Sequence, residues 1–195
     1  MTGISKYDFA FMAASLRMND MLLVAKALRD GEEVDVVNDL GKGKAATGKR
    51  IYREMVKRVH QLTKEELDLL VDGDFGEQRL MAYLAVCKCY RFILDFVVEV
   101  LREKYLSYDY EIRDGEYYSF FNEKNEWHLE MDRLSDSSKK KIRQVVFLIL
   151  EQAGIIDSTK DKNIEIPYLG SAVTRVVRAD NIGLMKLFFV NDLDL

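Results

Sequence analysis

The stretch from Leu80 to Leu101 constrains the fold of this chain more than any other. If it is laid on a helix at 100° per residue, its charged side chains share one narrow stripe and the remaining surface is apolar or small. The stripe consists of Lys88, Arg91, Asp95, Glu99 and, just past the end, Arg102. Leaving the apolar side chains in water would cost about 1.5–3 kcal/mol each. We therefore expect a central helix, or two consecutive ones, surrounded by other helices.

The same stretch argues against a membrane protein. Charges recur in it every three or four residues, and no apolar run approaches the roughly 20 residues that span a bilayer. The N-terminus also lacks a basic segment followed by an apolar one, as a signal sequence would have. We expect a soluble, cytoplasmic protein that does not contact a membrane.

The rest of the chain predicts a mostly α-helical protein, a helical bundle around the central helix. Only one proline, Pro167, occurs in 195 residues of 48% hydrophobic content. Thr63 followed by Glu66 is a capping box that begins a helix. Apolar periodicity, together with helix-ending residues such as Gly31 and Gly154, predicts helices over about 8–29, 32–40, 45–61, 64–72, 75–104, 117–124, 135–153 and 171–179.

The C-terminal third has a different pattern. Ile155 and Ile156, a polar loop, and the alternating Ile164, Glu165 and Ile166 indicate a small β-hairpin between two helices. Helix, hairpin and helix together suggest a helix-turn-helix or winged-helix-like unit. We therefore place a boundary near residue 106, with an N-terminal helical domain over 1–106 and a winged-helix-like domain over 107–195. One compact unit is the alternative.

Positive charge is concentrated in one segment. The net charge is −4, but residues 42–58 hold seven basic residues and one acid, Glu54. This segment is therefore +6 and the remainder −10. On the helix predicted there, Lys49, Arg50, Arg53 and Lys57 share an arc separate from the apolar residues. Together with Lys42 and Lys44 on the preceding loop, this arc is a candidate phosphate-binding surface, although a solvated basic face without a ligand is the alternative.

A second interpretation of this segment is a nucleotide-binding P-loop. The run from Gly43 to Lys49 has the P-loop spacing, in which backbone N–H groups and a lysine hold phosphates. Arg50, however, stands where magnesium needs a Ser or Thr, and no apolar strand precedes the run. We favour a helix N-terminus whose Thr47 and free N–H groups grip a nucleic-acid phosphate. Lys139, Lys140, Lys141 and Arg143 form a second candidate patch.

Catalytic and metal sites find little support. His60 and His128 are the only histidines, too few for a metal site or a catalytic triad. Asp95 and Glu99 are flanked by arginines and are better explained as ion pairs. Cys87 and Cys89 point away from each other on a helix, so we expect reduced core thiols. We expect no cofactor, no metal and no small-molecule substrate.

Three runs resemble a known family. They are Ala46–Ile51, Asp95–Val100 and, above all, Arg143–Thr159. In this order and at these separations, over roughly residues 12–170, they resemble the BrxA family, the small helical component of bacteriophage-exclusion (BREX) defence systems. The resemblance implies a non-enzymatic, all-helical protein with likeness to NusB-type or helix-turn-helix modules. It also implies DNA binding and offers no catalytic residues.

These observations lead to two hypotheses. The first is an accessory protein of a BREX system that binds double-stranded DNA through basic helix faces. The second is a protein–protein adaptor that contacts other BREX subunits through its acidic remainder or through the aromatic segment that follows the central helix. The salt dependence of binding separates them. DNA affinity should fall as the salt concentration rises, because neutralised phosphates release counterions, whereas an apolar adaptor interface would barely respond.

Overall fold

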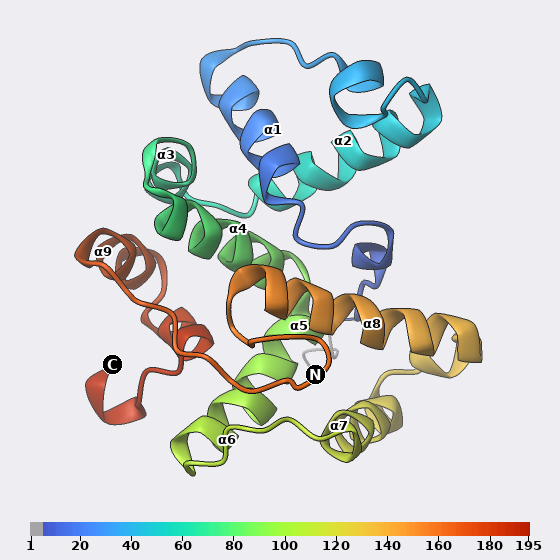
Figure 1. The fold of residues 1–195 in the computed structure, drawn as a ribbon, viewed down its shortest axis with the longest axis vertical. Helices are drawn as coiled ribbons and strands as arrows, with labels where there is room; N and C mark the ends of the chain where they lie inside the picture. The colour runs from blue at the N-terminus through green and yellow to red at the C-terminus, as the bar shows by residue number, and fades with distance from the viewer. Residues whose placement is uncertain (1–5) are drawn as a thin grey trace, which may run out of the picture.

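The stretch predicted to be central forms a run of helices through the middle of the molecule (Figure 1). The structure, a computed structural model, describes residues 6–195. The run consists of α4 (Phe75–Cys89), α5 (Arg91–Phe96), the π-helical η3 (Val97–Leu101) and α6 (Arg102–Leu106). Every residue from Leu80 to Cys87 is buried, which confirms the predicted central position.

Tyr90 divides this run into two parts. Its backbone is extended (φ −125°, ψ 92°), so the helix breaks there, although the Tyr90 N–H still bonds to the carbonyl of Val86. The Tyr90 ring is fully buried against Phe11, at 5.3 Å between ring centroids. Long-range packing of this ring therefore holds the break, which gives two consecutive helical parts.

Most helices of the N-terminal part are shorter than predicted, and the helix over 64–72 has the predicted bounds. This part contains the 3₁₀ turn η1 (Ala10–Ala13), α1 (Met18–Asp30), the π-helical η2 (Val36–Leu40), α2 (Ala45–Val59) and α3 (Lys64–Asp72). The single helix expected over 8–29 is wrong in its first half, because Arg17 is left-handed (φ 48°) and separates η1 from α1. The helix expected over 32–40 is reduced to η2. Thr63 and Glu66 form the predicted capping box of α3.

The C-terminal part is helical without a hairpin. It contains α7 (Asp114–Trp127), η4 (Met131–Arg133), α8 (Asp136–Ala153), α9 (Ser171–Asp180), η5 (Ile182–Phe188) and η6 (Asp192–Asp194). As expected, Ser135 caps α8 and Gly154 ends it in a left-handed conformation. Within residues 6–195, no strand forms.

The predicted β-hairpin at 155–168 is therefore wrong. Ile156 and Ile164 form an isolated bridge, while Asn163 pairs on its other side with Glu111. The Asp157 carboxylate accepts the N–H of Asn163 at 2.9 Å and so fastens the loop as a closed turn. Pro167 then removes a backbone donor, so neither pairing is extended into a ladder. Without a hairpin, this part of the chain has no wing.

The two halves share their core. Buried apolar side chains from Tyr7 to Phe189 form one continuous cluster. α9 packs against α3 and α4 as well as against η5. The division into two domains near residue 106 stays a prediction. Over the described residues, no helix combines the length and the apolar character needed to cross a bilayer.

Candidate nucleic-acid interface

The basic arc of α2 is exposed, as its spacing predicts. The opposite side of α2 is anchored by Ile51, Met55 and Val59, which are all buried. Lys49, Arg50 and Arg53 lie on the exposed side, and no carboxylate of residues 6–195 forms an ion pair with any of the three. The helix is thus held by one face and presents uncompensated positive charge on the other.

The loop before α2 extends this surface. Lys42 and Lys44 are exposed, and no ion pair involving either one occurs in the part of the chain that the structure describes. Lys44 is the N-cap of α2 but makes no capping hydrogen bond through its side chain, and Thr47 is half-buried in the first turn. The first-turn N–H groups lie at the positive end of the helix dipole, beside these lysines.

The P-loop alternative does not fit this geometry. α2 already begins at Ala45, so Gly48 and Lys49 lie within the helix, and the Gly48 N–H bonds to the carbonyl of Lys44. The element before the run is the π-helical η2 and not a strand. Gly48 instead lets η2 approach closely, since a Cβ atom there would stand 1.9 Å from the carbonyl oxygen of Val36. Gly48 therefore serves packing.

Lys57 differs from its neighbours on the arc. It is half-exposed, forms an ion pair with Asp8, and its Nζ lies 4.7 Å from the centroid of the Tyr90 ring. Burial opposes both charges, but the hydrogen bond between them prevails, so the pKa of Lys57 is raised and that of Asp8 is lowered. Lys57 is therefore partly committed to holding residue 8 against α2.

Arg58, counted in the basic excess, is wholly buried. Its Nε donates to Glu54 at 3.0 Å, and its guanidinium also donates to the carbonyls of Ala14 and Ser15 at 2.7 and 2.6 Å. Glu54 accepts a second hydrogen bond from the Tyr90 hydroxyl. Burial and this hydrogen bond raise the pKa of Tyr90. Sequence analysis missed this network, although the i, i+4 spacing of Glu54 and Arg58 was a readable signal.

The second basic patch also contains both exposed residues and a residue that is tied to a carboxylate. Lys140 and Lys141 are exposed and Lys139 is half-exposed at the start of α8. Arg143 instead forms an ion pair with Asp114 and lies over the rings of Tyr118 and Phe147, at 5.7 and 5.4 Å. Arg143 therefore joins α8 to α7, and only the three lysines of this patch face outward.

The two patches lie on different helices that share a neighbour. η1 packs against both α2 and α8. In Figure 1 both helices have their N-terminal ends toward the right-hand side of the molecule. The structure thus places the predicted site residues in two exposed groups, while Lys57 and Arg143 are tied to carboxylates.

The remaining polar candidates are structural. His128 is buried, stacks on Tyr7 at 3.8 Å between ring centroids, and its Nδ1 lies 3.0 Å from Glu130. Asp95 forms an ion pair with Arg91 at 2.7 Å and accepts the Tyr7 hydroxyl at 2.9 Å. These contacts support the expectation that the charges of the central run form ion pairs. Cys87 and Cys89 are both free thiols.

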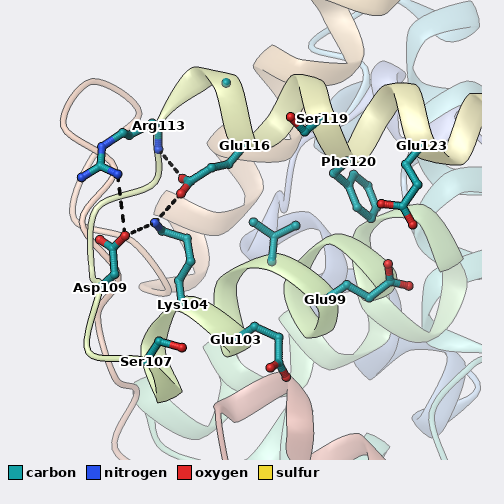
Figure 2. A pocket seen from close by; sticks show the side chains of 12 residues that line it. Glu99, Glu103, Lys104, Ser107, Asp109, Arg113, Glu116, Ser119, Phe120 and Glu123 are labelled. Carbon is teal, nitrogen blue, oxygen red and sulfur yellow. Dashed lines mark hydrogen bonds and ion pairs between the residues drawn. The ribbon is translucent and has the colours of Figure 1, made fainter.

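A groove of opposite charge lies between the central run and α7 (Figure 2). Its cavity has a volume of about 610 Å³. Five acids line it, Glu99, Glu103, Asp109, Glu116 and Glu123, against two basic residues, Lys104 and Arg113. Lys104 is held at one end between Asp109 and Glu116. The groove is therefore acidic and would repel phosphates.

Comparison with known proteins places the chain in one family. The model of the BrxA family matches residues 5–181. The BREX protein BrxA of Bacillus cereus (strain H3081.97) is 25% identical over 145 residues, which are 74% of this chain and 72% of that protein. The BREX protein BrxA of Escherichia coli O9:H4 (strain HS) is 23% identical over 138 residues, 71% of this chain and 65% of that protein.

A solved structure has the same fold. The crystal structure of an uncharacterized protein from Magnetospirillum magneticum matches with a TM-score of 0.80 over 95% of this chain and 98% of that one, at 18% identity. At this identity the likeness concerns the fold alone. The family match spans nearly all of the chain, including α2, the central run and α8. This chain belongs to the BrxA family.

Proposed function

We propose that this chain is a non-enzymatic component of a BREX system that binds duplex DNA through the phosphate backbone. The contact surface is the α2 face, defined here as Lys42, Lys44, Lys49, Arg50 and Arg53. One observation carries the proposal: these five side chains are exposed and lack ion-pair partners among residues 6–195, on a chain whose net charge is −4.

Uncompensated charge of this kind suits phosphates. Each phosphate that a lysine or arginine neutralises releases condensed counterions, so log affinity falls with log salt by about 0.9 per neutralised phosphate. The free N–H groups in the first turn of α2 add donors beside the charges. Phosphate contacts carry no base sequence, so unrelated duplexes should bind with similar affinity. Lys139, Lys140 and Lys141 form a second, smaller contact region.

Charge reversal tests the α2 face. The triple variant Lys49→Glu, Arg50→Glu and Arg53→Glu removes three exposed charges that no carboxylate compensates. Binding of a labelled duplex is measured by fluorescence anisotropy at several salt concentrations. We expect weaker binding and a salt slope flatter by about 0.9 for each phosphate that is no longer neutralised. Lys160→Glu, at an exposed position of the 157–163 loop, is the control and should bind as the parent does.

Charge reversal of the α8 lysines gives the result that would contradict the assignment to α2. If Lys139→Glu, Lys140→Glu and Lys141→Glu together abolish binding while the α2 triple variant binds normally, the DNA lies on α8 and the assignment to α2 is wrong. If neither variant changes affinity or slope, the chain does not bind DNA through these faces. Substituting exposed side chains changes stability by about 0.5 kcal/mol or less, so both variants should remain folded.

The acidic groove favours a second candidate function, an adaptor for other BREX subunits. Its five acids and two bases would attract a basic segment of a partner. Glu123→Lys reverses an exposed groove residue, and Glu126→Lys is the matched control on the same helix outside the groove. Co-purification with the other subunits of the same system should be lost in the first variant and kept in the second. Equal behaviour of the two variants would remove the groove from consideration.

A further inference from the structure

A second cavity opens where three helices meet, away from both basic patches. The starts of α1 and α4 and the end of α8 border an open pocket of about 460 Å³, which is the size of a small-molecule site. It is lined by Leu16, Arg17, Met18, Asn19, Asp20, Phe75, Arg79 and Gln152. None of these residues belongs to the α2 face or to the acidic groove.

Arg79 is one of the two arginines that line this cavity. Within residues 6–195 it has no ion-pair partner, and its Nε is buried without a hydrogen-bond acceptor. Gly154 makes room for the guanidinium, since a Cβ atom there would stand 2.8 Å from Cζ and Nη1 of Arg79. The Arg79 guanidinium thus lacks a counter-charge among residues 6–195, and an anion in the cavity would supply one.

Phe75 supplies an aromatic wall one helical turn before Arg79. Its side chain is 67% exposed, an unusual state for a phenylalanine, and the capping box of Asp74 and Glu77 fixes the backbone at this end of α4. The Arg79 Cζ lies 6.0 Å from the centroid of the Phe75 ring. Phe75 thus offers an exposed aromatic ring beside the guanidinium, and a flat aromatic ligand can stack on this ring.

Further donors converge on the same space. The Gln152 side chain is oriented by its oxygen, which accepts the N–H of Leu16 at 3.0 Å, so its amide NH₂ group is available to a ligand. The start of α1 has no capping side chain, and its first backbone hydrogen bond is that of Met21 to Arg17. Asp20 is the one acid in the lining and is neutralised by Arg17.

We propose that this cavity binds one nucleotide, with the base stacked on Phe75 and the phosphate held by Arg79 and Gln152. A ring surface beside a cation without a counter-ion fits a ligand that combines a planar base and an anion. The shared chemistry is that of a nucleoside monophosphate, either free or at the 5′-phosphorylated end of a DNA strand. The inference does not rest on duplex binding by the α2 face.

Titration with dAMP tests the proposal on the full chain. Backbone NMR shifts are followed with dAMP, deoxyadenosine and inorganic phosphate, up to about 10 mM each. We expect dAMP to shift the amides of the cavity residues, and to bind at least about tenfold more tightly than either of its parts. Phe75→Ala and Arg79→Gln should each weaken dAMP binding about fivefold or more.

Matched controls separate the cavity from general effects. Trp127 is 66% exposed and Arg133 is exposed, and neither lines the cavity, so Trp127→Ala and Arg133→Gln should change dAMP affinity less than about twofold. The α2 triple variant should keep dAMP binding even if it loses duplex DNA. If Arg79→Gln unfolds, Phe75→Ala remains informative, because that ring is exposed.

Two further measurements complete the test. A 5′-phosphorylated tetradeoxyadenylate that binds more tightly than both dAMP and the unphosphorylated strand identifies a DNA end, whereas equal affinity of strand and dAMP identifies a free nucleotide. Absence of shifts in the cavity, or equal loss of affinity in Phe75→Ala and Trp127→Ala, would overturn the proposal.

Discussion

At the scale of single residues, the buried charges decide how α2 is held. Arg58 is wholly buried, yet its guanidinium is matched by Glu54 and by the carbonyls of Ala14 and Ser15. A buried charge is tolerable only when its partners are in place, because its desolvation cost is otherwise uncompensated. This network joins α2 to the segment before α1 and, through Tyr90, to the central run.

Removing one partner should therefore be costly. We expect Arg58→Met to lower the free energy of unfolding by roughly 3–5 kcal/mol, since Glu54 would remain buried without its counter-ion. The double variant Glu54→Gln and Arg58→Met should be less destabilised than Arg58→Met alone. Urea denaturation measures both, with Arg53→Met as the exposed control on the same helix. A loss below about 1 kcal/mol for Arg58→Met would contradict this account.

The two thiols should differ in reactivity. Burial raises the pKa of both Cys87 and Cys89, which disfavours the reactive thiolate, but Cys87 is fully buried and Cys89 is half-buried. We expect slow labelling of Cys89 and still slower labelling of Cys87 by a bulky thiol reagent, followed by mass spectrometry. Both should react quickly in urea. Rapid native labelling of Cys87 would show that α4 is not buried as described.

At the scale of elements, glycine controls how η2 sits on α2. Gly41 and Gly48 lie where the two elements touch, and a Cβ atom at either would stand within 2.7 Å of backbone oxygen atoms. Rotation of a side chain cannot relieve such a contact, because the backbone atoms involved move only when their whole segment moves. The close approach fixes the loop that carries Lys42 and Lys44.

Two Gly→Ala variants should therefore have opposite effects. Gly48→Ala should destabilise the protein by about 1–3 kcal/mol, because overpacking outweighs the better helix propensity of alanine. Gly115→Ala in the first turn of α7 meets nothing within 4 Å and should stabilise by roughly 0.5 kcal/mol. Thermal unfolding compares the two. Stabilisation by Gly48→Ala would show that η2 does not pack on α2 in this way.

At the scale of the whole molecule, Asp114 joins three segments. It begins α7 and forms ion pairs with Arg143 on α8 and, at 2.9 Å, with Lys162 on the following loop. The hydrogen bond from Lys162 is the main cause that lowers the pKa of Asp114 below its ordinary value of 3.8, and Arg143 adds to it. A lowered carboxyl pKa contributes stability above the unfolded-state pKa, and this stability is lost as pH falls through the folded-state value.

Asp114→Asn should reveal this contribution. The parent should be more stable than the variant by less than about 1 kcal/mol, because solvent screens the half-exposed pair. The difference should stay constant from neutral pH down to the region of 3.8 and shrink below it. Urea denaturation at several pH values measures this. A difference that grows as the pH falls would contradict the assigned sign.

Local patterns in the sequence were enough to predict much of the helical fold. Apolar periodicity predicted the burial of 80–101 and the anchored face of α2, while Thr63, Ser135 and Gly154 marked the ends of α3 and α8. The exposed positions of Lys49, Arg50 and Arg53 followed from the same spacing. All these features depend on residues within one or two helical turns of each other, which a linear pattern records.

Only the tertiary structure decided the remaining features, because their partners are distant in sequence. The break at Tyr90 depends on Phe11 and Glu54, and the burial of Arg58 on carbonyls more than 40 residues away. The 155–168 segment is limited to the single bridge of Ile156 with Ile164 while Asn163 pairs with the distant Glu111, and the position of the Arg79 guanidinium depends on Gly154, which lies beside it. Periodicity predicts which side of a helix is apolar. It does not predict which distant segment packs against that side, because this depends on long-range contacts that the local pattern does not contain.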